Sequence, residues 1–381
     1  MLAIDRAISK RRIQQLACLD KLPAAVLPAT VVPPHEVHPL RGELSGMAFT
    51  VEDTMDVQGV PTRGGMSLAK LFDEPAEVSD AWVEALKGAN CQFAGKVKSP
   101  PFGHGLAGCF DEVYSDSSSA APIHIGIDTY GWGRCMGALH GHWVFRAGVG
   151  RFIGGLPIVP SLDSPAVIAS NWELLRQVLP IVLGHRESAS TWKDPLAAEA
   201  DTLVRKRLLL VEYAGHVTSP ACRQSIRSRF PHFDCQSPIQ TLASGRRILQ
   251  KTSGAFVTLA EREAHYIHRY WLSEYESSYP PQLLRRLQRG ARLSAVSVAA
   301  ARDVQRQVRR LLLNWLDDWD VVALPLIFKK DNLLVTSDFA EGSILSQLAP
   351  IQLSGLPAFS IPLGTEQDHV MALQLIIRAD C

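Results

Sequence analysis

Short apolar segments alternate with helix-forming segments along the whole of this 381-residue chain. The apolar segments have the length and β-branched content of buried strands. They lie at 47–51, 91–95, 123–127, 205–212, 321–325, 359–362 and 371–378. This alternation is typical of an α/β protein and argues against an all-helical or all-β fold. We therefore predict α/β architecture with a central mixed sheet flanked by helices on both faces.

Helical periodicity between these strands predicts five helices. They cover 1–22, 79–88, 166–183, 258–275 and 293–319. A glycine-rich turn is expected after the strand at 123–127, and a Gly-, Ser- and Pro-rich loop over 99–121. The predicted organisation is an N-terminal helix and Pro-rich connector over 1–41, followed by a single domain over 42–381.

Charge and composition restrict the function classes. Lys+Arg (39) and Asp+Glu (38) leave a formal net charge of +1, which gives no global reason to expect a nucleic-acid partner or an anionic membrane. The apolar run 351–364 is interrupted by two prolines, so it falls short of the roughly 20 residues that span a bilayer. The seven cysteines form no C-x-x-C pair, which favours reduced thiols and a cytoplasmic location.

Four ordered segments resemble the amidase-signature family. The first is GELSGMAFTVEDTMDVQGVPTRGG at 42–65. The second is IGIDTYGWGR at 125–134, which runs into ALHG at 138–141. The third is PSLD at 160–163, and the fourth combines WDVVALP at 319–325 with LSGLPAFSIPLG at 353–364. The resemblance extends from residue 42 to the C-terminus and implies the amidase-signature fold.

The segment 44–51 is most similar to the plant-type branch of that family. This branch includes indole-acetamide hydrolases and a non-enzymatic chloroplast outer-envelope import receptor. The resemblance therefore implies a fold shared by enzymes and by a protein without catalysis, so it leaves the function open.

The family hydrolyses C–N amide bonds with a Ser–cis-Ser–Lys triad, and the resemblance implies that this chain lacks all three groups. The lysine aligns with Glu52, the bridging serine with Gly108 and the nucleophilic serine with Trp132. Indole has no nucleophilic oxygen, and a glutamate does not replace a neutral lysine as base. Since such groups act as a unit, amide hydrolysis is not expected beyond background.

Two other chemistries stay open as candidates. Glu52 and Asp128 form a carboxylate pair that the fold would bring near one pocket, where it would support acid–base catalysis such as isomerisation or cyclisation. Cys109 is a candidate relocated nucleophile, with His104, His140 or His142 as its base. The Ser115–Ser119 segment is a weaker candidate for residual hydrolysis, because it also has the composition of a surface loop.

The former amidase pocket is expected to bind a small molecule. The ligand-binding candidates are Asp53, Thr129, Tyr130, Gly131, Trp132 and Arg134. Tyr130 and Trp132 suit an apolar or aromatic ligand. A protein partner is the alternative, a homodimer is left open, and neither a cofactor nor a metal is expected.

Three polar clusters elsewhere have simpler interpretations. His140 and His142 share a face if they lie on a strand, but no third metal ligand has convincing spacing. Glu261, His265 and His268 lie on one face of the predicted helix over 258–275, and Arg302, Arg306, Arg309 and Arg310 form a stripe on the next one. For both helices we expect a solvated polar face.

Overall fold

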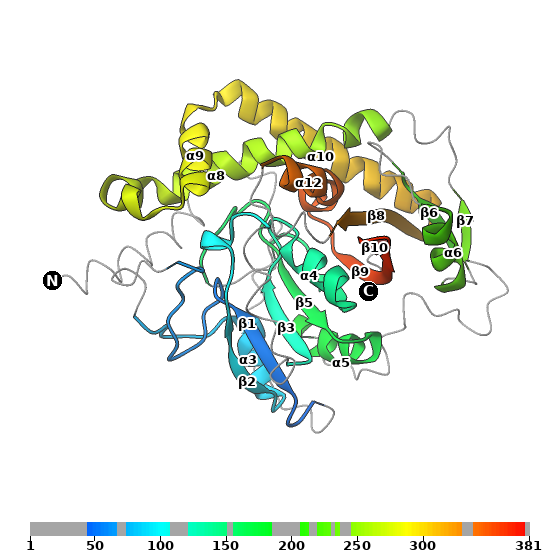
Figure 1. Ribbon diagram of the computed structural model, residues 1–381, viewed down its shortest axis with the longest axis horizontal. Coiled ribbons are helices and arrows are strands. Elements are labelled where there is room, and N and C mark those ends of the chain that lie inside the picture. Colours follow the sequence, from blue (N-terminus) through cyan, green and yellow to red (C-terminus); the bar gives the residue numbers. More distant parts are fainter. Residues whose placement is uncertain are drawn as a thin grey trace.

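A computed structural model describes residues 44–66, 74–106, 121–150, 155–184, 206–212, 219–229, 233–236, 245–329 and 338–377 of the chain. Strands within these residues form one ten-stranded sheet in the order β2-β1-β3-β5-β4-β9-β10-β8-β6-β7 (Figure 1). The central pairs, from β3 across to β8, are antiparallel. Parallel pairs form both ends, β1 with β2 and β3, and β6 with β7 and β8. The predicted mixed sheet is confirmed.

The strands have the following bounds: β1 (Ala48–Glu52), β2 (Gln92–Val97), β3 (Ile123–Ile127), β4 (Trp143–Arg146), β5 (Pro165–Ala169), β6 (Lys206–Leu210), β7 (Phe233–Gln236), β8 (Val321–Lys329), β9 (Ala358–Glu366) and β10 (His369–Ile377). Two long central strands, β9 and β10, are buried along most of their length. Their continuous apolar runs are typical of strands covered on both faces.

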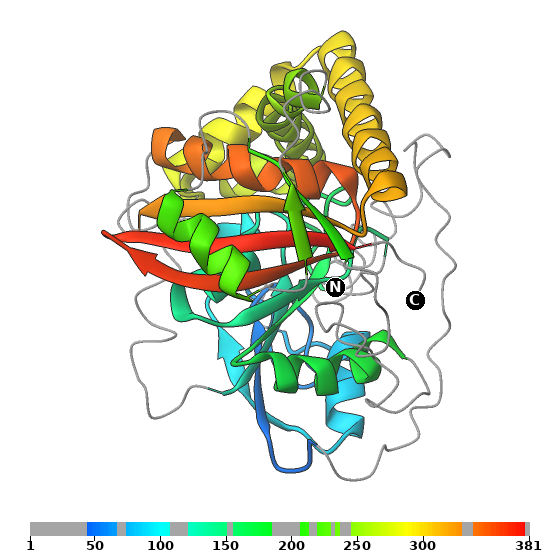
Figure 2. The same ribbon diagram turned by 90° about the vertical axis from the view of Figure 1, so that its right-hand side faces the viewer.

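The helices have the following bounds: α3 (Ala81–Gly88), α4 (Trp132–His140), α5 (Trp172–Leu183), α6 (Pro220–Arg229), α8 (Thr252–Tyr275), α9 (Pro281–Arg292), α10 (Ala295–Asp318) and α12 (Asp338–Ser354). Short 3₁₀ turns, η2 (Pro101–Gly103) and η3 (Glu276–Ser278), lie between them. Figure 1 shows α8, α9 and α10 as a helical layer on one side of the molecule, with α3 and α5 at the opposite side; Figure 2 gives the same arrangement turned by 90°.

Side-chain contacts assign helices to both faces of the sheet. A Cβ added at Gly133 of α4 would lie 3.5 Å from the Cβ of Ala166 in β5, so α4 covers the face on which Ala166 lies. Ala169, three residues further along β5, faces the other way. Its cross-strand partner Trp143 places its ring 5.3 Å from that of Trp172 in α5. Helices therefore cover both faces, as predicted.

One predicted helix is wrong in its first part. The span 166–183 divides into β5 and α5, and Asn171 begins the helix because its Oδ1 accepts the Leu174 N–H at 2.9 Å. Short apolar runs have the same pattern in a buried strand as in a helix, so periodicity alone does not separate them. The glycine-rich turn expected after 123–127 is followed at once by α4, and neither α9 nor α12 is among the predicted helices.

Some predictions lie outside the described residues. The predicted helix and connector over 1–41 belong to this group, and the assignment of 42–381 to a single domain stays a prediction. Among the helices that the structure describes, none combines the length and apolarity needed to cross a bilayer.

The close contact between α4 and β4 gives a stability test. We expect Gly137→Ala to lower the free energy of unfolding by about 1–3 kcal/mol, because the added Cβ would lie 2.1 Å from Cγ2 of Val144. Gly254→Ala on the exposed side of α8 is the matched control; nothing lies within 4 Å of its added Cβ, so it should stabilise by about 0.5–1 kcal/mol. Urea denaturation measures both, and a Gly137→Ala protein as stable as the parent would contradict this packing.

Candidate functional site

Glu52, which the sequence resemblance aligns with the family lysine, lies on the face of the sheet that α4 covers. Its Oε2 accepts a hydrogen bond from the Ile127 N–H of β3 at 2.7 Å. Gly126 leaves room for the carboxyl group, since an added Cβ there would lie 2.6 Å from Oε2. The two strands therefore hold this carboxyl in one place.

Burial dominates the chemistry of Glu52, which is only 1% exposed. Desolvation raises the pKa of Glu52 to about 8, and the nearby carboxylates of Asp128 and Asp53 add to the rise. Glu52 is thus protonated at neutral pH. It can donate a proton there, but it is not an ionised base.

Trp132, which the sequence resemblance aligns with the nucleophilic serine, begins α4 and is 2% exposed. Its ring packs edge-on against His124 of β3, with ring centres 5.1 Å apart. Nδ1 of His124 lies 3.0 Å from Oγ1 of Thr50 in β1. Burial, with a contribution from His142, lowers the pKa of His124 to about 3, so the imidazole is neutral. The indole therefore occupies the space between the start of α4 and the sheet.

The turn between β3 and α4 is held by buried ions. Nε of Arg134 lies 2.8 Å from Oδ2 of Asp128, and Nε of Arg146 lies 3.5 Å from the same oxygen. Arg134 also donates to Oε1 of Gln374 in β10 at 2.6 Å. Burial and the charge of Arg134 lower the pKa of Arg146 to about 9. Asp128 is therefore bound to two cations, which assigns it a structural part in this turn.

The next residues of the turn are equally constrained. Thr129 donates its hydroxyl to Oδ1 of Asp163 at 2.6 Å, and burial raises the pKa of that carboxyl to about 6. Gly131 has a φ of +87°, and a Cβ there would lie 2.5 Å from Cδ1 of Leu348 in α12. Only glycine combines this backbone angle with this approach.

The sequence resemblance aligns Tyr130 with a glycine of the family. Tyr130 is buried, and its hydroxyl lies 3.1 Å from Nδ1 of His104. Its ring meets Phe256 of α8 edge-on at 5.2 Å, and the Arg286 guanidinium of α9 lies 6.0 Å above it. The helical layer therefore packs directly on this turn.

Asp53 organises the chain that follows β1. Its two carboxylate oxygens accept the N–H groups of Arg63 and Gly65 at 3.1 and 3.0 Å. Nζ of Lys96 lies 3.5 Å from Oδ1. These bonds give Asp53 a turn-forming role.

The structure brings most of the predicted site residues together. Glu52, Asp128, Thr129, Tyr130, Gly131, Trp132 and Arg134 are all buried around the start of α4, with Asp53 at the edge. Cys109, Gly108 and the Ser115–Ser119 segment lie outside the described residues. His104, a candidate base for Cys109, has its Nδ1 engaged with Tyr130.

For one polar cluster a condition of the metal-site interpretation does not hold, and for a second cluster the predicted solvated face is wrong. His140 ends α4 and is followed by Gly141 in a left-handed conformation, so His140 and His142 do not share a strand face. Glu261 and His268 are buried, because α9 packs on the helix face that the sequence pattern assigned to solvent. Among the described residues no group of three metal-ligating side chains gathers.

The arginine stripe on α10 is only partly solvated. Arg302 is half-buried and pairs with Glu263 of α8 at 2.5 Å, while Arg309 donates to the Ser354 carbonyl at 2.7 Å. Arg306 is exposed and pairs with Asp303 on its own helix. The stripe therefore joins α10 to its neighbours as well as facing water.

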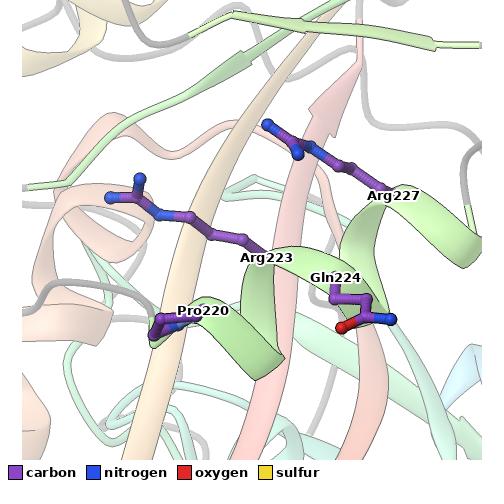
Figure 3. A pocket seen from close by; sticks show the side chains of 4 residues that line it. All are labelled: Pro220, Arg223, Gln224 and Arg227. Carbon is purple, nitrogen blue, oxygen red and sulfur yellow. The ribbon is translucent and has the colours of Figure 1, made fainter.

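A surface pocket of about 540 Å³ lies along α6, apart from the buried residues at the start of α4. Figure 3 shows the residues that line it, which are Pro220, Arg223, Gln224 and Arg227. All four are exposed, and Arg223 pairs with Glu212 at 2.9 Å. Exposed side chains of this kind are typical of a solvated helix face, so we do not place the functional site there.

Sequence reasoning missed His124, Arg146, Gln374 and His268 as residues of this region. His124 had a signal, since it is the one charged-type side chain inside the apolar run at 123–127. Arg146 and Gln374 reach the turn from distant strands, and only the sheet topology brings them there.

The chain has the fold of amidase-signature enzymes. It superposes on a bacterial aryl acylamidase of the amidase-signature family with a TM-score of 0.66 at 15% identity, over 88% of this chain and 80% of that one. No model of a protein family matches the sequence.

Two curated relatives align along most of the chain. Outer envelope protein 64, mitochondrial, of Arabidopsis thaliana is 25% identical, over 96% of this chain and 68% of that protein. A glutamyl-tRNA(Gln) amidotransferase subunit from Methanospirillum hungatei is 22% identical, over 88% of this chain and 90% of that protein. The relatives therefore include both a component of an enzyme and an envelope protein.

The raised pKa of Glu52 predicts a pH-dependent stability difference. The folded protein keeps the proton up to about pH 8, whereas the unfolded chain releases it near pH 4.5, so the stabilising effect is lost as the pH rises between these values. Glu52→Gln removes this dependence while keeping an acceptor for the Ile127 N–H. The stability of the variant relative to the parent should therefore rise from pH 5 to pH 8, by on the order of 1.4 kcal/mol per pH unit at most.

Thermal or urea unfolding between pH 5 and pH 8 measures the free energy of unfolding of both proteins. Subtracting the parent's value from that of Glu52→Gln cancels the contribution of the other titrating groups. A difference that stays constant with pH would contradict a buried, protonated Glu52.

Proposed function

We propose that this protein is a non-hydrolytic homologue of amidase-signature enzymes that binds a small-molecule ligand at the former amidase pocket. One observation carries the proposal: Glu52 and Trp132, at the lysine and nucleophile positions, are buried and packed against the sheet. A protonated carboxyl group cannot take a proton from a nucleophile, and an indole cannot attack an amide carbon.

The preserved turn supports retention of a binding role. The Asp128 ion cluster and the Thr129–Asp163 bond fix the backbone around Gly131, and the aromatic rings of Tyr130 and Trp132 flank this glycine in the sequence. Pockets of this composition favour apolar ligands with a few polar groups. A protein partner for the same face is the alternative, and the expected cytoplasmic location and absence of a nucleic-acid partner stay predictions.

An enzyme with altered chemistry is the second candidate, and the pKa of Glu52 favours it. A carboxyl group with a pKa of about 8 holds a proton that it can transfer near neutral pH, as general acids do. Proton transfer, isomerisation or cyclisation would use this property. The close packing of Trp132 against His124 favours the non-catalytic proposal.

We expect a serine-directed fluorophosphonate probe to leave the natural protein unlabelled and a panel of aryl and alkyl amides to show no turnover above background. Loss of a complete triad lowers kcat by about a million-fold in a well-studied serine protease. Labelling or turnover would contradict the proposal, and Cys109→Ala then tests whether the relocated thiol is responsible.

The triple variant Glu52→Lys, Gly108→Ser, Trp132→Ser restores the family triad. If the probe labels this variant and not the natural protein, the result would support a fold that is retained although the catalytic side chains are lost. Its circular dichroism spectrum shows whether it folds, and the result on the natural protein stands in either case.

A further inference from the structure

A second polar cluster, which we call the histidine–tyrosine box, lies beside the former pocket. It consists of His104 after η2, Tyr130 in the turn before α4, His268 on α8 and Tyr279 before α9. Nδ1 of His104 lies 3.1 Å from the Tyr130 hydroxyl, and Nδ1 of His268 lies 2.9 Å from the Tyr279 hydroxyl. The two imidazole rings have centres 5.5 Å apart. Both imidazole side chains are buried.

Each imidazole leaves one nitrogen unsatisfied. Nε2 of His104 and Nε2 of His268 are both buried, and neither has a hydrogen-bond partner among the described residues. A buried polar atom without a partner costs about 1–3 kcal/mol, so native structures nearly always supply one. Two such atoms on adjacent rings therefore need a hydrogen-bond partner that the described residues do not supply.

Hydrogen-bond accounting shows what kind of group this is. Burial raises the pKa of Tyr279, so its phenol keeps its proton and needs an acceptor. Nδ1 of His268 is the acceptor within reach, and accepting this bond places the imidazole proton on Nε2. The opposite tautomer would leave both the phenol proton and the Nε2 lone pair unsatisfied. Tyr130 and His104 are joined in the same way, through a tyrosine hydroxyl and Nδ1 of an imidazole. If Tyr130 likewise donates to Nδ1, the proton of His104 lies on Nε2. The box then presents two N–H donors, one from each histidine.

The surroundings add charge and aromatic walls. Burial lowers the pKa of both histidines, so they are neutral, and the Arg286 guanidinium beside Tyr130 and His104 supplies a positive charge. Phe102 packs edge-on against His268 at 4.6 Å and stacks on Tyr279 at 5.7 Å. N–H donors, a nearby cation and apolar walls together favour an anionic oxygen acceptor.

The backbone of Phe102 is the strained point of the box. Its φ is +51°, a left-handed conformation that bulky residues rarely adopt. Gly103 follows with a φ of +68°, and a Cβ there would lie 2.3 Å from Cδ1 of Ile158. The tight turn that places Phe102 and His104 against α8 is therefore retained at a cost, as is common at ligand sites.

We propose that the two imidazole N–H groups of His104 and His268 bind the carboxylate of a small organic acid whose body lies against the aromatic walls of the box. This inference rests on the proposed binding function and names the ligand class. Tyr130 joins the box to the turn that leads into α4.

The test uses acetate and benzoate as probes, with benzylamine as a cation that lacks an oxygen acceptor. Nitrogen-15 NMR of the histidine side chains reports the tautomer of His104 and His268 directly. We expect both rings to carry their proton on Nε2, and the Nε2–H signals to shift saturably with acetate or benzoate and not with benzylamine.

His268→Phe and His104→Phe keep a flat aromatic ring without the N–H donor, and each should weaken carboxylate binding at least tenfold. His369→Phe, at the start of β10, is the control and should bind like the parent. Three results would each overturn the proposal: protons on Nδ1 of the two imidazoles, no saturable shift with either carboxylate, or parental affinity in both box variants. If no saturable shift is seen, water fills the box. The outcome is separate from the fluorophosphonate test, which concerns hydrolysis alone.

Discussion

The buried ions around Asp128 fix the turn on which the rest of the site depends. One carboxylate faces two guanidinium groups. Nη1 and Nη2 of Arg146 donate to the carbonyls of Leu356 and Leu162 at 3.2 and 3.1 Å. A buried ion pair tolerates no loss of a partner, because the group left behind is a desolvated charge. The cluster joins β3, α4, β4 and β10, so the turn cannot shift without disturbing the centre of the sheet.

Because these contacts hold the turn, its backbone can be retained when nearby side chains change. The ions, the Thr129–Asp163 bond and Gly131 preserve the backbone beside the start of α4. None of these contacts involves Glu52 or Trp132, the residues that the resemblance aligns with catalytic groups, so the fold does not depend on which side chains stand at those two positions. The likeness to a bacterial aryl acylamidase at 15% identity is of this kind, since it extends over the fold.

Sequence patterns predicted the mixed sheet and the residues around the turn, because motif order and alternation carry that information. They failed where tertiary packing decides. The apolar run 165–169 became a strand only because it pairs between β3 and β4. His268 was assigned to solvent on helical periodicity, yet α9 and the loop at Phe102 bury it. The pKa of Glu52 likewise depends on burial that no local pattern encodes.

Hydrogen exchange of the Trp132 indole N–H tests most directly whether this side chain is packed against His124 of the sheet and shielded from solvent. Its signal can be assigned by its loss in Trp132→Phe. The indole nitrogen is buried without a hydrogen-bond partner among the described residues, so burial alone protects it. We predict exchange only through global unfolding, at the opening free energy of the β3 amides. Exchange about 100-fold faster or more would show that solvent reaches the indole in the folded state, and would contradict the packing of Trp132 against the sheet.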